Sequence, residues 1–166
     1  SYPDQLEQIV AVHRETKRLL DLAGYRLTGV ADEGGWGPHL ESNEKAIQIL
    51  TDAISNINPR MTIALDVAAS QFPHQSAAMI DLLDDWCRRF PIRSIEDALA
   101  EDDWAGWKLL TERLGQRVQL VGDDFFTTNL TRLNRGIAEG CANAVLVKMN
   151  QIGTLTETFA VIDRAR

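Results

Sequence analysis

The stretch that decides the fold runs from residue 143 to residue 153 and reads Asn-Ala-Val-Leu-Val-Lys-Met-Asn-Gln-Ile-Gly. Residues 144–147 are apolar and rich in β-branched side chains, which is typical of a strand buried on both faces of a parallel sheet. Lys148 ends this run. Neighbours along a strand cannot easily pair its ammonium, which must be solvated, matched to carboxylates from elsewhere, or lowered in pKa.

Working back along the chain, three further strands are predicted, and an acidic residue follows each. Residues 61–65 lead to Asp66, residues 92–95 lead to Glu96, and residues 118–121 lead through Gly122 to Asp123. Helices are predicted after these strands, over residues 76–89, 103–114 and 130–139, and after Lys148 from about residue 154. The ionisable residues recur every 25 to 30 residues, about the length of one βα unit. This alternation predicts right-handed βαβ units and a parallel sheet.

The first third of the chain has a different pattern. Two amphipathic helices are predicted over residues 3–22 and 43–57, the second capped by Ser42 and stopped at Asn58-Pro59. Residues 25–30 are expected to be extended. Residues 31–38 read Ala-Asp-Glu-Gly-Gly-Trp-Gly-Pro, and three glycines with a proline predict a loop around Asp32 and Glu33.

Length and composition narrow the class of protein. The chain has 166 residues, 45% of them hydrophobic, and a formal net charge of -7. One domain of ordinary globular composition is therefore expected. Nucleic acid and anionic membrane are disfavoured as partners, because both attract basic surfaces. No apolar run approaches the roughly 20 residues that span a bilayer, so a soluble, cytoplasmic protein is expected.

The carboxyl ends of parallel strands lie on one face of a sheet or barrel, and in (β/α)8 barrels this face holds the active site. Asp66, Glu96, Asp123 and Lys148 should therefore converge. Two carboxylates about 4 Å apart repel by roughly 4 kcal/mol at an effective dielectric constant near 20. A divalent cation removes the conflict, and an all-oxygen donor set favours Mg²⁺, or Mn²⁺, over zinc.

This constellation suggests a reaction. A metal beside Lys148 would favour its neutral form, so that it could act as a general base. A lysine with Mg²⁺ suits the removal of a proton from carbon next to a carboxylate, because the metal stabilises the enolate. Glu33 is the available general acid for a leaving hydroxide.

The same residues carry a resemblance to enolases, the phosphopyruvate hydratases of glycolysis. Five segments look like enolase segments and occur in the family's order: residues 31–35 with Pro38, 65–70, 94–97 with 102–104, 121–124 with 128–129, and 146–153. The resemblance spans nearly the whole chain. It implies a TIM-type (β/α)8 barrel of the enolase kind, beginning ββαα, of which about half is present: two helices followed by four βα units.

The resemblance also implies roles for individual residues. Lys148 takes the C2 proton of 2-phosphoglycerate, and Glu33 assists departure of the C3 hydroxyl to give phosphoenolpyruvate. Three acidic residues hold the Mg²⁺, and two further residues are candidate substrate contacts. The metal set is Asp66, Glu96 and Asp123, and the substrate contacts are Gln151 and His39. The partner is a small phosphorylated carboxylic acid, and a homodimer is expected of the full-length protein.

The domain expected over residues 1–166 is thus a partial barrel. The family's amino-terminal α+β domain, its first two barrel strands and its last βα units have no counterpart here. Either these residues are a segment of a longer protein or they form an excised piece whose open sheet edges need a partner.

Other interpretations remain open. Ala98 replaces the family's usual proline, and residues 71–76 lack an insertion, which allows a related lyase acting on another phosphorylated or phosphonylated three-carbon acid. A non-catalytic binding module derived from an enolase is a third possibility. The strand-end acids can also be read as helix N-terminal acids favoured by the helix dipole. Glu33 can be read as part of a turn, and Lys148 as a surface lysine.

Overall fold

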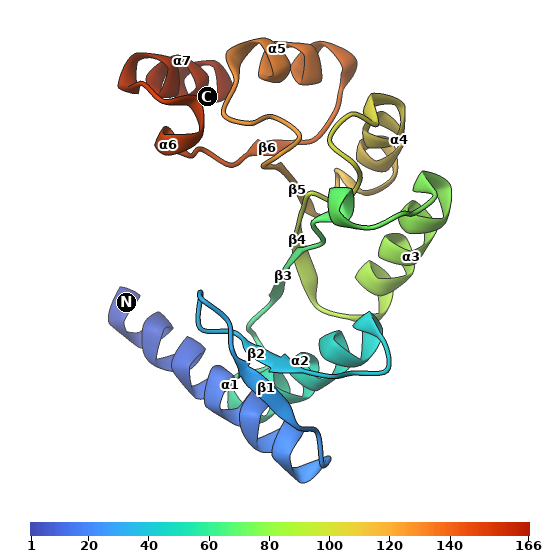
Figure 1. The fold of residues 1–166 in the computed structure, drawn as a ribbon, viewed down its shortest axis with the longest axis vertical. Coiled ribbons are helices and arrows are strands. Elements are labelled where there is room, and N and C mark those ends of the chain that lie inside the picture. The colour runs from blue at the N-terminus through green and yellow to red at the C-terminus, as the bar shows by residue number, and fades with distance from the viewer. The chain divides into compact units, whose positions relative to one another are not determined.

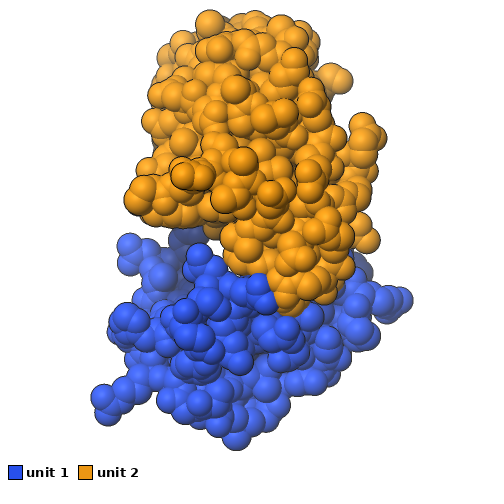
Figure 2. Space-filling view, turned by 90° about the vertical axis from the view of Figure 1, so that its right-hand side faces the viewer, with its two compact units in different colours: residues 1–62 blue, residues 63–166 orange.

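A computed structural model describes residues 1–166, which form two compact units, residues 1–62 and residues 63–166 (Figure 2). Each unit has its own buried side chains, and each is described here by itself. None of the helices combines the length and the apolar character that crossing a membrane requires.

The first unit is two helices and a small hairpin. Its elements are α1 (Tyr2–Leu22), β1 (Leu27–Val30), β2 (Trp36–Pro38) and α2 (Asn43–Ile57) (Figure 1). Both helices lie within a residue of their predicted bounds, and Ser42 caps α2 by accepting a hydrogen bond from the backbone N–H of Lys45 at 3.2 Å. The two helices pack against each other and bury apolar residues from both: Val12, Leu20, Ile47, Ala53 and Ile54.

The hairpin corrects one prediction. Residues 31–38 were expected to form a loop throughout, but their last three residues pair antiparallel with β1. The side chain of Thr28 donates to the carbonyl of Gly37 at 2.7 Å, and the N–H of Ala31 donates to the carbonyl of Gly35 at 2.8 Å. Gly34, at φ 88°, makes the tight turn between the strands possible. These cross-strand bonds outweigh the low strand propensity of glycine and proline.

The second unit contains one four-stranded sheet and the helices that connect its strands. In chain order its elements are β3 (Ile63–Asp66), the 3₁₀ turn η1 (Ala69–Gln71), α3 (Ser76–Arg89), β4 (Ile92–Glu96), α4 (Trp104–Leu114), β5 (Gln119–Gly122), α5 (Leu130–Glu139), β6 (Ala144–Val145), α6 (Met149–Ile152) and α7 (Leu155–Ala165). All four strands are parallel, in the order β3-β4-β5-β6.

This strand order confirms the predicted fold class. The strands follow one another across the sheet in chain order, whereas a doubly wound sheet reverses its order at a switch point. In Figure 1 the helices α3, α4 and α5 cover one face of the sheet, and the other face carries no helix. An open sheet wound in this way is an arc of a (β/α) barrel.

The last strand is shorter than expected. Residues 144–147 were predicted as strand, but only Ala144 and Val145 pair with β5, which itself ends at Gly122. The N–H of Leu146 still reaches the carbonyl of Gly122 at 3.0 Å, and beyond it no neighbouring strand remains to pair with. The helix expected from residue 154 is preceded by the separate short helix α6, which ends at Gly153 with φ 99°.

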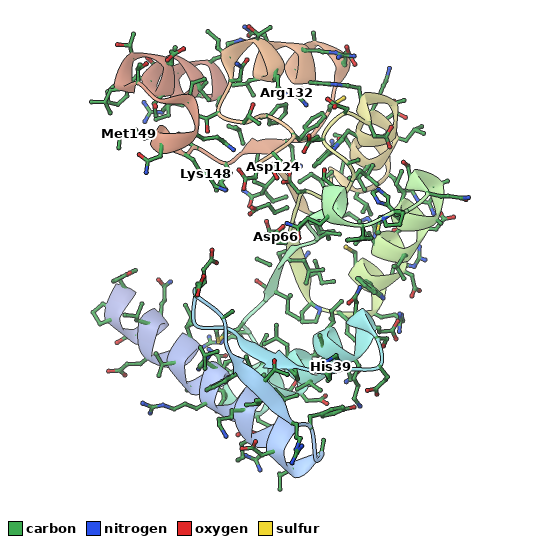
Figure 3. All side chains as sticks on the ribbon, viewed as in Figure 1. His39, Asp66, Asp124, Arg132, Lys148 and Met149 are labelled. Atoms are coloured by element: carbon green, nitrogen blue, oxygen red, sulfur yellow. The ribbon has the colours of Figure 1, made fainter.

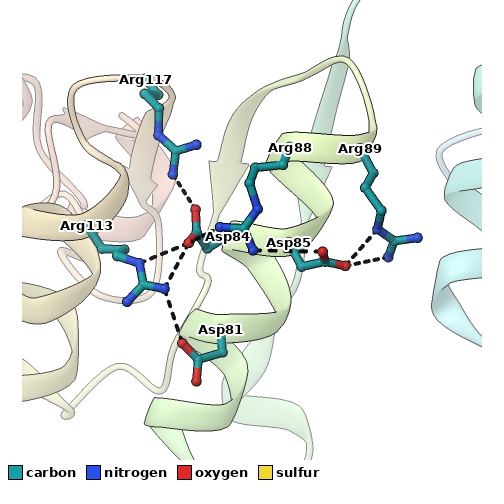
Figure 4. Close-up of polar contacts among 7 residues, drawn as sticks. All are labelled: Asp81, Asp84, Asp85, Arg88, Arg89, Arg113 and Arg117. Atoms are coloured by element: carbon teal, nitrogen blue, oxygen red, sulfur yellow. Dashed lines mark hydrogen bonds and ion pairs between the residues drawn. The ribbon is translucent and has the colours of Figure 1, made fainter.

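The connecting helices pack on the sheet through a continuous apolar core. The indole of Trp107 on α4 stacks on Phe125, with ring centroids 4.4 Å apart, and both side chains are fully buried. At the outer side of α3 the buried carboxylate of Asp84 receives three arginines (Figure 4). Arg88 of α3 and Arg113 of α4 donate at 2.7 and 2.9 Å, and Arg117 donates to the other oxygen.

Candidate active site

Strand register places the predicted acidic residues at one level. Asp66, the last residue of β3, pairs in register with Glu96, the last residue of β4. Glu96 in turn pairs with Val121 of β5, two residues before Asp123. Figure 3 shows Asp66, Asp124 and Lys148 at this end of the sheet. The structure thus brings together the four strand-end residues that the sequence pattern predicted.

The electrostatics of Glu96 show how closely these charges interact. Its pKa is raised above the ordinary value for a glutamate, first by burial and then by the negative charges of Asp66, Asp123 and Asp97, while Lys148 acts in the opposite direction. Neighbouring carboxylates disfavour the ionised form of one another in this way. The strand ends therefore form one coupled set of charges.

Asp123 is the centre of this set. It is buried, with 7% of its surface exposed, and both of its carboxylate oxygens accept hydrogen bonds. The ammonium of Lys148 donates to Oδ2, and Nε2 of Gln151 donates to Oδ1 at 3.3 Å. Lys148 is the residue that immediately precedes α6, and its side chain is 48% exposed.

The protonation of Lys148 depends on what else binds Asp123. The hydrogen bond to Asp123 raises the pKa of Lys148, and the charges of Asp123, Asp124 and Glu96 add to the effect. The sequence led us to expect a neutral Lys148 in a site that holds a metal cation. With the carboxylates alone, the ammonium is the favoured form.

Asp97 is a residue that sequence reasoning gave no role. It directly follows Glu96, is buried, and has φ 41°, a left-handed conformation that side chains other than glycine rarely adopt. Its two carboxylate oxygens accept the backbone N–H groups of Asp123 at 3.0 Å and of Asp124 at 2.9 Å. Burial raises the pKa of Asp97, and these hydrogen bonds oppose that shift. Asp97 therefore holds the turn that presents Asp123.

The donor set fits a hard divalent cation. Carboxylate oxygens of Asp97, Asp123 and Asp124 lie within 4.8 Å of one another. Both oxygens of Asp97 accept backbone N–H groups, whereas the donors to Asp123 are side chains, which can rotate away from the carboxylate when a ligand binds. Asp66 and Glu96, the other two predicted ligands, are not part of this cluster, but burial and then the charges of Asp66 and Asp123 raise the pKa of Glu96. Clustered oxygen donors of this kind are the ligands that Mg²⁺ takes in proteins.

Glu33 and His39, the remaining predicted site residues, belong to the first unit. Glu33 is exposed in the β1–β2 turn, where the carbonyl of Gly34 accepts a hydrogen bond from Nε2 of His13 at 2.8 Å. The His13 ring also stacks on Trp36, with centroids 4.4 Å apart, so α1 holds the turn in place. This function of His13 was not predicted, because it rests on a contact between residues 21 apart.

His39 is also exposed and lines an apolar groove of about 910 Å³ between α1 and α2. Nothing in the first unit tests the part predicted for Glu33 in catalysis or for His39 in substrate binding. Both assignments stay predictions, as does the contact of Gln151 with substrate.

A parallel sheet wound in chain order, with acidic residues and a lysine at the carboxyl ends of its strands, defines an α/β barrel protein with its candidate active site at that end. The model of the C-terminal TIM barrel domain of enolase matches the chain over residues 3–82 and 73–166. The chain therefore belongs to the enolase family, which confirms the resemblance seen in the sequence. At this level, fold and family together support an enolase-like lyase.

Proposed function

We propose that the protein dehydrates 2-phosphoglycerate to phosphoenolpyruvate in a Mg²⁺-dependent reaction, with Lys148 as the base. The observation that carries the proposal is the contact between the Lys148 ammonium and Asp123 at the strand ends, beside Glu96 and Asp66. This arrangement supports the proposal, because a lysine lies next to a set of carboxylates that suits a cation-bound, anionic substrate. Membership in the enolase family supports the reaction class.

Asp66, Glu96 and Asp123 would hold the metal ion. When bound, Mg²⁺ would neutralise these carboxylates and supply positive charge for the negative charge that develops on the substrate carboxylate. The attraction of Asp123 for the Lys148 proton falls as that carboxylate is neutralised, and the pKa of Lys148 falls with it. The neutral amine is then available to accept a proton.

The reaction needs one proton acceptor and one proton donor. Lys148 Nζ takes the proton from C2, and the electron pair left behind forms the C2–C3 double bond as the C3–O bond breaks. A proton supplied by Glu33, acting as the general acid, converts the departing hydroxide to water. Glu33 is exposed and lies on a turn fixed by His13, which suits a group that exchanges protons with solvent between turnovers.

The test compares Lys148→Ala with Lys108→Ala in the complete natural protein. Lys108 is an exposed lysine on α4 of the same unit, so the pair controls for loss of a lysine as such. We expect Lys148→Ala to slow phosphoenolpyruvate formation, followed by absorbance, at least about 100-fold, the usual contribution of a general base. Exchange of the C2 proton with solvent deuterium should disappear, while Lys108→Ala behaves as the wild type. Exchange at the wild-type rate in Lys148→Ala would remove Lys148 from the role of base.

A related lyase acting on another phosphorylated or phosphonylated three-carbon acid was the alternative suggested by Ala98 and by the missing insertion at residues 71–76. That side chain is fully buried, as is Leu99 beside it, so the departure from proline lies in the core and not on a surface that a ligand can touch. Ala98 therefore does not support the alternative, which then rests on the missing insertion. Faster turnover of a three-carbon phosphonate than of 2-phosphoglycerate would establish it, and absence of Mg²⁺-dependent turnover of either would favour a binding module.

A further inference from the structure

A buried threonine lies near the candidate base and takes no part in the proposed proton transfers. Thr128 lies between β5 and α5 and is fully buried. Both Thr127 and Thr128 have positive φ, 50° and 51°. This conformation is rare for β-branched residues and persists only where the surroundings hold it in place.

The Thr128 hydroxyl makes three hydrogen bonds: a long one to the carbonyl of Leu146 at 3.5 Å and two shorter ones that lead to the candidate site. It accepts the backbone N–H of Lys148 at 2.9 Å and donates to Oε1 of Gln151 at 2.8 Å. The orientation of the Gln151 amide follows from its partners. The carboxylate of Asp123 can only accept, so Nε2 faces Asp123 and Oε1 faces Thr128.

These contacts close a ring of four residues. Thr128 binds Lys148 and Gln151, and Lys148 and Gln151 each bind one oxygen of Asp123. One buried hydroxyl thus fixes the main chain from which the Lys148 side chain starts. The same hydroxyl also orients the amide of Gln151, which is the second hydrogen-bond donor to the Asp123 carboxylate that the Lys148 ammonium contacts.

We propose that Thr128 is a positioning residue for Lys148, and that its hydroxyl sets the place from which the amine reaches the substrate. The proposal rests on the proposed function, because it takes Lys148 as the base. Thr128 itself would touch neither substrate nor metal ion. Its loss should therefore slow proton transfer while leaving substrate and Mg²⁺ binding in place.

The main test is Thr128→Val in the complete natural protein. Valine keeps the shape and the β-branch of threonine, so the demand on the backbone at φ 51° stays the same and only the hydroxyl is lost. We expect kcat and the rate of C2 proton exchange in deuterium oxide to fall about 10- to 100-fold, the range that a misplacement of about 1 Å produces. KM for 2-phosphoglycerate and the Mg²⁺ concentration for half-maximal rate should stay within about twofold.

The second comparison keeps the test decisive if valine impairs folding. Thr128→Ser and Thr128→Ala both remove the β-branch, and they differ from each other by the hydroxyl alone. Serine should restore most of the wild-type kcat, and alanine should not. The matched control is Thr158→Val, since Thr158 is another buried threonine of the same unit whose hydroxyl bonds only within α7, to Thr154 O at 2.7 Å. That variant should keep the wild-type kcat.

Two results would overturn the positioning role: wild-type kcat in Thr128→Val, or serine and alanine variants that are equally slow. A rise in KM and in the Mg²⁺ requirement of the same size as the fall in kcat would also overturn it, by showing a general structural defect. Lys148→Ala separates this inference from the proposed function. If Lys148→Ala is inactive and Thr128→Val is normal, only the positioning role fails, whereas an active Lys148→Ala removes the base on which both depend.

Discussion

The carboxylate of Asp123 accepts hydrogen bonds from the Lys148 ammonium and the Gln151 amide, and this sets it apart from the exposed carboxylate of Asp124 beside it. Both carboxylates lie in the cluster of oxygen atoms within 4.8 Å, so geometry alone leaves two candidate ligands at this turn. Of these two aspartates, Asp123 is the one among the charges that raise the pKa of Glu96. This electrostatic link to the other strand ends favours Asp123 as the ligand.

The two residues can be separated by titrating Mg²⁺ into Asp123→Asn and Asp124→Asn by calorimetry. We expect Asp123→Asn to lose more affinity than the about 10- to 100-fold that loss of an outer partner of a ligand produces. Asp124→Asn should stay within about threefold of the wild type, because its carboxylate is exposed and solvent can replace it. The reverse order of affinities would move the metal ligand from Asp123 to Asp124.

Asp97 gives a related prediction at the same scale. Asparagine at this position keeps one acceptor oxygen but loses the second, so either the N–H of Asp123 or that of Asp124 loses its partner. Asp97→Asn should then weaken Mg²⁺ binding by about 10- to 100-fold, as expected for a residue that orients a ligand. Glu101→Gln, an exposed acid of the same unit, is the control. Equal Mg²⁺ affinity in the two variants would mean that Asp97 does not orient the site.

How much of the site the sequence predicts depends on the kind of contact involved. Lys148, Asp66, Glu96 and Asp123 follow from position alone, because every strand of a parallel sheet ends at the same level. Thr128 acts through its hydroxyl, and its hydrogen-bond partners lie 20 and 23 residues away. Such roles depend on positive backbone angles and on distances between loops, for which hydrophobic periodicity carries no signal.

At the scale of elements, long periodic segments are predicted well and short paired ones are not. The bounds of α2, α3 and α5 agree with the pattern of apolar residues, and the caps Ser42 and Asn129 are in place. β2 and β6 were misjudged because the partner strand decides how far each of them extends. A strand of two or three residues contains too little sequence to show a period.

Asp84 on α3 stabilises this helix through its ion pairs. The free energy of unfolding should therefore depend on the charge of Asp84, and so on pH. Hydrogen bonds from Arg117 and Arg113 and the charge of Arg88 lower the pKa of Asp84 to about 2. In the unfolded chain an aspartate has a pKa of about 3.9. Its contribution to the free energy of unfolding is therefore complete above about pH 4 and is lost as the pH falls from there toward 2.

Asp84→Asn should lower the free energy of unfolding in urea at pH 7 by about 1 to 3 kcal/mol, the range for losing hydrogen bonds to a charged group. The three arginines are 45 to 56% exposed, so water can solvate them afterwards and the larger loss of a fully buried pair is not expected. The difference between variant and wild type should shrink between pH 4 and pH 2. Asp85→Asn, which removes the half-exposed partner of Arg89 and a weaker partner of Arg88, should change the free energy by less than about 1 kcal/mol. A pH-independent difference for Asp84→Asn would show that its charge is not what stabilises α3.

At the scale of the whole molecule, the strand-end carboxylates link metal binding to folding. Burial and then the charges of Asp66, Asp123 and Asp97 raise the pKa of Glu96, so the ionised carboxylates oppose folding where no cation is bound, and Lys148 offsets this in part. A ligand that binds only the folded protein stabilises it by RT ln(1 + [L]/Kd), about 2.7 kcal/mol at a hundredfold excess over Kd. Removing Mg²⁺ with a chelator should therefore lower the melting temperature of the complete natural protein, and adding it back should restore the value.

Comparing the Mg²⁺-dependent rise in melting temperature among variants shows which residues of the site bind the ion. Lys148→Ala should keep the Mg²⁺-dependent rise in melting temperature, since the lysine is not a ligand and its removal leaves all three carboxylates in place. Asp123→Asn should lose most of the rise, and Asp163→Asn, at a carboxylate 75% exposed on α7, should show all of it. A full rise in Asp123→Asn would locate the stabilising ion elsewhere in the molecule. A rise abolished by Lys148→Ala would mean that the ammonium holds the carboxylates in the geometry that the ion requires, and that acid–base chemistry and metal binding cannot be separated at this site.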